Sequence, residues 1–78
     1  MRKKVDALVV TFAAATDAMA AEKYLIERQL PGRLIPLPSE IDAGCGLAWK
    51  APVDAEALLR QALDLAGLRW DVMMVVAI

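Results

Sequence analysis

The segment from Val5 to Phe12 constrains the fold most, because both of its faces are apolar. It is rich in β-branched and apolar residues and contains no glycine or proline, which is typical of a β-strand. In a strand its side chains form two rows, with Leu8, Val10 and Phe12 on one face and Ala7, Val9 and Thr11 on the other. A strand that is apolar on both faces needs cover on both. We therefore predict that this segment is a central strand.

Two helices are predicted from apolar positions that recur with helical spacing. The first spans residues 13–30, with Thr16 and Asp17 as N-terminal capping residues and Pro31-Gly32 as its end. The second begins with Pro52 at its first helical position and ends at Gly67. Their apolar positions are Ala14, Ala18, Ala21 and Leu25 in the first helix, and Ala55, Leu58, Leu59, Ala62 and Leu65 in the second.

Three further strands complete the pattern. Arg33 to Leu37 contains Pro36 and precedes Pro38, which predicts an edge strand because proline cannot donate to a ladder. Cys45 to Ala51 follows the loop at 38–44, and Trp70 to Ile78 ends in a continuous apolar run. The order βαββαβ predicts a single α+β domain over residues 1–78. Right-handed crossovers fold it into a ferredoxin-like, four-stranded antiparallel sheet with both helices on one face.

Composition excludes several classes of function. The formal net charge of −1 offers no basic field for nucleic acid, and the chain lacks the aromatic pattern of an RNA-binding sheet. It contains no histidine and only one cysteine, so we expect no hydrolase triad, no metal site and no cofactor.

Compartment can also be predicted from the sequence. A single cysteine excludes an intramolecular disulfide framework and indicates a reducing environment. The segment from Arg2 to Ala20 imitates a secretory signal, but Asp6 and Thr11 interrupt its apolar part and cleavage would remove the predicted central strand. No segment reaches the length of about 20 apolar residues needed to span a bilayer. We expect a cytoplasmic protein that does not bind membranes.

The candidate reactive group is Cys45, which stands between Gly44 and Gly46 where the loop at 38–44 leads into the third strand. Glycine permits positive φ and leaves the sulfur reachable, and a cysteine reacts as its thiolate. The loop residues Ser39 and Glu40 are its candidate supports.

The run Arg33 to Pro36, the Pro38-x-x-Ile41 loop and Cys45-Gly46-Leu47-Ala48 resemble a family of small bacterial proteins described as selenium or sulfur carrier-like. The resemblance extends upstream to the stretch at 18–25 and downstream through the second helix. The chain departs from the family pattern at Ser39, where members often carry a basic residue, and in the run before the cysteine. The resemblance implies that Cys45 is a carrier thiol that exchanges sulfur or selenium with donor and recipient proteins. It would hold the atom as a persulfide or selenopersulfide, without a complete catalytic site of its own.

The predicted topology places the hairpin loop at the same end of the sheet as residues 11–17 and 67–70. The N-terminus of a helix stabilises a nearby thiolate or anion, so Thr11, Thr16 and Arg69 are candidate contacts. In the alternative hypothesis Cys45 is a small buried hydrophobe, as free cysteines most often are. The protein is then a non-catalytic interaction or regulatory module.

Self-association is predicted from the apolar sheet. Two helices cover one face only, while the first and last strands are apolar on both. We expect a homo-oligomer, in the simplest case a homodimer that packs sheet to sheet or pairs the edges of its last strands.

Overall fold

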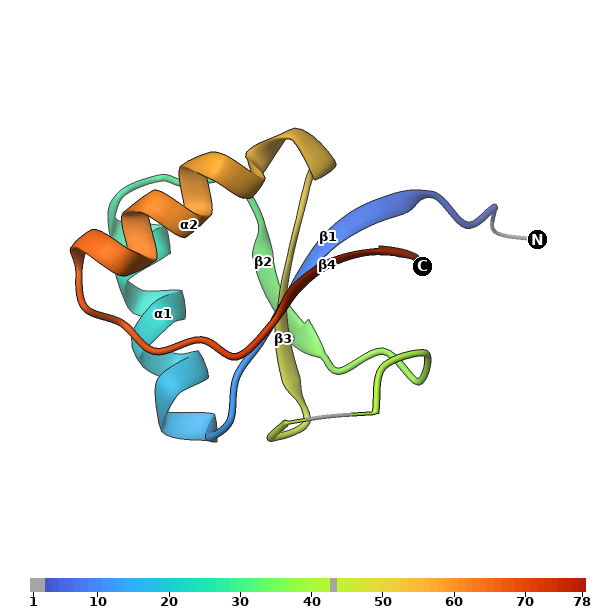
Figure 1. Cartoon of the computed structure of the whole chain (residues 1–78), viewed down its shortest axis with the longest axis horizontal. Coiled ribbons are helices and arrows are strands. Elements are labelled where there is room, and N and C mark those ends of the chain that lie inside the picture. The colour runs from blue at the N-terminus through green and yellow to red at the C-terminus, as the bar shows by residue number, and fades with distance from the viewer. Residues whose placement is uncertain (1–2, 43) are drawn as a thin grey trace.

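The computed structural model describes residues 3–42 and 44–78. Ala43 of the predicted loop, together with Met1 and Arg2, lies outside these described residues. The described chain forms the predicted order of strands and helices (Figure 1). Its elements are β1 (Asp6–Thr11), α1 (Ala15–Glu27), β2 (Arg33–Pro36), β3 (Leu47–Ala51), the short 3-10 turn η1 (Val53–Ala55), α2 (Glu56–Leu65) and β4 (Met73–Ala77).

The four strands form one sheet in the order β2-β3-β1-β4, and every neighbouring pair is antiparallel. Leu8 at the middle of β1 is aligned with Ala51 of β3 and with Val75 of β4. Both helices lie on the same side of the sheet (Figure 1). This arrangement confirms the predicted ferredoxin-like fold and the central position of β1.

The main core lies between the sheet and the helices. The first predicted row of β1 points into it, and Trp49 of β3 is its largest fully buried side chain. The indole N–H of Trp49 donates a hydrogen bond to the carbonyl of Pro31 at 3.0 Å, so its one polar atom is satisfied. The buried residues of this main core are Leu8, Val10, Phe12, Ala18, Ala21, Leu25, Trp49, Ala51, Ala55, Leu59 and Leu63.

A second, smaller core lies on the face opposite the helices. Val9 and Ala48 are fully buried there, and Ile41 from the loop between β2 and β3 packs with them. This face is apolar as predicted, but the loop covers its centre, which the sequence did not reveal. Ile35, Leu37, Met74, Val76 and Ile78 surround this cluster and stay partly buried.

The predicted ends of α1 are wrong on both sides. The helix begins at Ala15 after the N-cap Ala14, with no side-chain capping bond, so Thr16 and Asp17 lie inside its first turn. It ends at Glu27 because Gln29 adopts a φ of 55°. The N–H groups of Gln29 and Leu30 then bond back to the carbonyls of Ile26 and Leu25, as in a Schellman motif.

Smaller corrections concern Pro52 and β4. Pro52 is the N-cap of η1 rather than the first helical residue, and α2 begins at Glu56. β4 begins at Met73, since Asp71 and Val72 both bond to Thr11 and interrupt the regular ladder.

Candidate functional site

Cys45 lies in a turn just before β3, which corrects the prediction that it begins the strand. The glycines on either side adopt the left-handed region, with φ of 74° at Gly44 and 87° at Gly46. Residues with a Cβ atom avoid this region because the Cβ comes too close to the backbone. Glycine has no Cβ, so it suits both positions of the turn.

Backbone contacts hold this turn against the end of β1. The N–H of Cys45 donates to the carbonyl of Phe12 at 3.1 Å. A Cβ atom added to Gly44 would lie 2.5 Å from the same carbonyl oxygen, closer than non-bonded atoms allow. On the other side, the carbonyl of Gly46 accepts the N–H of Leu37 at 2.9 Å. The backbone that carries the sulfur is therefore fixed at both ends.

The Cys45 side chain is half-buried and packs against the main core. Its nearest polar contact is weak, since Sγ lies 4.0 Å from the carbonyl oxygen of Leu47. Cys45 thus lies at the border of the main core, neither fully buried nor fully exposed.

Thr11 lies at the same end of the sheet. It is fully buried, and its Oγ1 accepts the N–H of Val72 at 3.1 Å. The backbone of Thr11 also bonds to Asp71 and Val72 at 2.8 Å each. These bonds attach the connection between α2 and β4 to the end of β1. The next residue along the chain is Phe12, whose carbonyl accepts the N–H of Cys45. The β1–α1, β2–β3 and α2–β4 connections therefore meet at one end of the sheet, as predicted, and the hydrogen bonds of Thr11 support this arrangement. A contact between Thr11 and an anion stays a prediction.

A cleft of about 440 Å³ opens at this end of the molecule. Arg69 contributes the cation of this cleft beside three carboxylates, and Cys45 is not among the residues that line it. Thr16 is exposed on the first turn of α1 and does not line the cleft either. Contacts of Thr16 or Arg69 with the sulfur remain predictions. The lining residues are Ala13, Asp17, Asp64, Leu68, Arg69, Trp70 and Asp71.

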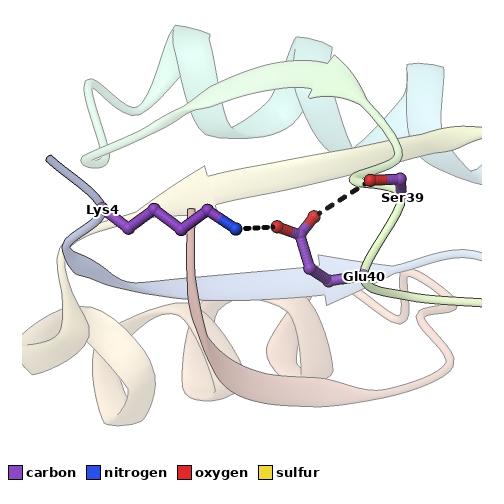
Figure 2. Close-up of polar contacts among 3 residues, drawn as sticks. All are labelled: Lys4, Ser39 and Glu40. Atoms are coloured by element: carbon purple, nitrogen blue, oxygen red, sulfur yellow. Dashed lines mark hydrogen bonds and ion pairs between the residues drawn. The ribbon is translucent and has the colours of Figure 1, made fainter. Parts of the chain in front are cut away.

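Ser39 and Glu40 contact a different part of the molecule (Figure 2). Lys4 Nζ donates to Glu40 Oε2 at 2.9 Å, and Ser39 Oγ donates to Glu40 Oε1 at 3.4 Å. Lys4 precedes β1, whereas Cys45 is bonded to Phe12 after β1. Glu40 and Cys45 thus contact opposite ends of the strand, so the structure places the two predicted supports away from the sulfur. The partner Lys4 was not predicted, because no local signal links residues so far apart in sequence.

The ion pair predicts a small pH dependence. The hydrogen bond from Lys4, followed by a backbone hydrogen bond and the charge of Lys4, holds the pKa of Glu40 below its ordinary value of 4.5. As the pH falls, the carboxylate of Glu40 is therefore protonated at a higher pH in the unfolded chain than in the folded chain. The stabilising effect of the Lys4–Glu40 ion pair is therefore present above pH 4.5, and it is lost as the pH falls through the pKa that Glu40 has in the folded protein.

We expect Glu40→Gln to flatten the acid side of a plot of unfolding free energy against pH, measured by urea titration. The effect should be small because the pair is exposed. Glu27→Gln, on the exposed surface of α1, is the control. If Glu40→Gln left the acid slope unchanged, the conclusion that Lys4 lowers the pKa of Glu40 in the folded protein would be contradicted.

The fold and the turn define a small α+β domain that presents its single cysteine between two glycines at one end of a sheet. The chain belongs to the family described as "Putative Se/S carrier protein-like", whose model matches residues 7–74. No curated protein and no solved structure gives a significant match. Over residues 3–42 and 44–78, no helix has the length and hydrophobicity to cross a membrane. The same residues contain no cluster of three or more side chains suited to hold a metal ion.

Proposed function

We propose that this protein carries sulfur or selenium on Cys45, as a persulfide or selenopersulfide, and delivers it to a partner enzyme. The observation that supports this most is the Gly44-Cys45-Gly46 turn in a chain of the carrier-like family. Hydrogen bonds hold the backbone of the turn on both sides of Cys45, and the residue is only half-buried.

The chemistry is thiol exchange. The thiolate of Cys45 attacks the outer sulfur of a persulfide, R–S–SH, on a donor protein. A new S–S bond forms to Cys45, the donor's S–S bond breaks, and the donor departs as the thiolate R–S⁻. A nucleophile of the recipient then attacks the outer atom on Cys45 and restores the Cys45 thiolate. A selenium atom in the outer position follows the same course. Each step is an exchange, so it needs no external oxidant or reductant.

A loading experiment tests this proposal. Incubation with a cysteine desulfurase and cysteine should add the mass of one sulfur atom to the intact protein, and a thiol reductant should remove it. Cys45→Ser should gain nothing under the same conditions. Ser39→Ala is the matched control, because it alters the same loop at a distance from the sulfur. Absence of the adduct on a folded protein with a free thiol would contradict sulfur loading. The same incubation with selenocysteine in place of cysteine, which leaves an outer selenium atom on the desulfurase's own cysteine, tests selenium by the same exchange.

The packing of Cys45 against the main core favours a second candidate, in which the cysteine is structural and the protein is an interaction module. The two candidates differ in how the native protein reacts with a mild thiol reagent. A carrier thiol should react in the native state at a rate that does not follow global unfolding. A structural cysteine should be protected until denaturant unfolds the chain.

A further inference from the structure

The outer edge of β4 carries backbone groups that the sheet does not use. Val5 and Ile78 exchange two hydrogen bonds, at 3.1 and 3.3 Å, so every second residue of β4 from Ile78 backwards turns its backbone toward β1. The alternate residues, Met73, Val75 and Ala77, turn their N–H and C=O groups away from the sheet. β4 is an edge strand, so among the described residues no strand pairs with these groups.

The two edges of the sheet differ in their protection. β2 at one edge is four residues long, begins with Arg33 and ends with Pro36, features that discourage the addition of another strand. β4 at the other edge reads MMVVA, with no charge, glycine or proline. Val75 at its centre is 49% exposed, although Leu8 beside it is fully buried. An exposed apolar edge of this kind is suited to strand addition.

We propose that a second copy of this chain covers this edge, with the two β4 strands antiparallel about a two-fold axis at Val75. Met73 of each copy then pairs with Ala77 of the other, and Val75 pairs with Val75. These are the residues with outward backbone groups, so each pair exchanges two hydrogen bonds. The strand is self-complementary, as a two-fold interface requires. The result is one continuous sheet through both copies.

The charges on α2 are compatible with this axis. One side of α2 faces α1 across a groove and includes Leu58 and Leu65. Helical geometry places Glu56 and Arg60 on the opposite side, and Arg60 stacks 5.0 Å from the ring centre of Trp70, just before β4. Within each copy Arg60 Nη2 lies 3.1 Å from Glu56 Oε2, so these two charges balance each other on this side of α2.

This dimer does not depend on the carrier function. It places the two sulfurs far apart, because Cys45 lies beside Phe12 and Thr11, at the end of the sheet where β4 begins. An antiparallel β4 pair sends these ends in opposite directions. The Cys45 thiols of one dimer are therefore not expected to form a disulfide with each other.

Sedimentation equilibrium at micromolar concentrations should show a dimer. Val75→Lys places two like charges at the axis and should raise the dissociation constant about tenfold or more. Leu65→Lys, at a residue that is 78% exposed on α2, is the matched control and should leave the dimer intact. Circular dichroism establishes that each variant is folded.

Two direct readouts complete the test. In a Cys45→Ser background, Val75→Cys should form a cross-chain disulfide, since paired Cα atoms about 5.5 Å apart suit that bond, whereas Leu65→Cys should not. Amide exchange should slow at Met73, Val75 and Ala77 as protein concentration rises. A wild-type monomer, a dimer indifferent to Val75→Lys, or concentration-independent exchange at these amides would overturn the proposal.

Discussion

Gly44→Ala is expected to destabilise the protein by about 3 kcal/mol, because positive φ and steric overlap act at the same residue. Its φ is 74°, and the new Cβ would lie 2.5 Å from the carbonyl oxygen of Phe12. That oxygen belongs to the backbone and also accepts the N–H of Cys45, so it has little freedom to move away. Urea unfolding measures the loss, and the rate of native-state labelling of Cys45 should change as the turn shifts.

Gly46→Ala is the matched control on the other side of the sulfur. Its φ is 87°, but no atom lies within 4 Å of the added Cβ. Only the conformational strain applies, and we expect a loss of about 1 kcal/mol. Equal losses in the two variants would show that the contact between Gly44 and Phe12 does not hold the turn.

Trp49→Ala is expected to cost about 4 kcal/mol, a large part of the stability of a domain this small. The side chain is fully buried at the centre of the main core, and its indole N–H is bonded to Pro31. Its removal leaves a cavity between β3 and the helices and frees the start of β2 from that bond. The far-ultraviolet circular dichroism signal during thermal unfolding measures the effect.

Trp70→Ala is the comparison for Trp49→Ala. Trp70 is partly exposed, bonds to Asp64 at 3.0 Å and stacks with Arg60 outside the sheet. Its loss should cost clearly less. A smaller loss for Trp49→Ala than for Trp70→Ala would contradict the placement of the core.

The elements with strong periodicity were predictable from the sequence, and their ends were predictable only where one residue type decides them. The alternation in β1 gave its central position, because each row of side chains meets its own core. The end of α2 was predicted at Gly67, which adopts a φ of 67° there. The end of α1 was missed because Gln29 takes the same role, and glutamine carries no signal for positive φ.

For the candidate site, connectivity predicted more than residue type did. The βαββαβ order alone brought the Cys45 turn to Phe12 and to the start of β4, as the hydrogen bonds now describe. The loop before Cys45 has no periodicity, so its path across the second face and the pairing of Glu40 with Lys4 were not predictable. Ser39 and Glu40 are near Cys45 in sequence, but this loop places them elsewhere.

The strand order has a consequence for how the chain matures during synthesis. β1 is made first, yet its neighbours β3 and β4 are made much later, and β4 follows every other element. A growing chain therefore exposes an apolar strand with both edges unpaired until β3 is made, and with its other edge open until β4 has left the ribosome. Contacts so distant in sequence slow folding and lengthen the exposure of such strands to aggregation. Newly made chains should accordingly depend on chaperones more than the size of the domain suggests.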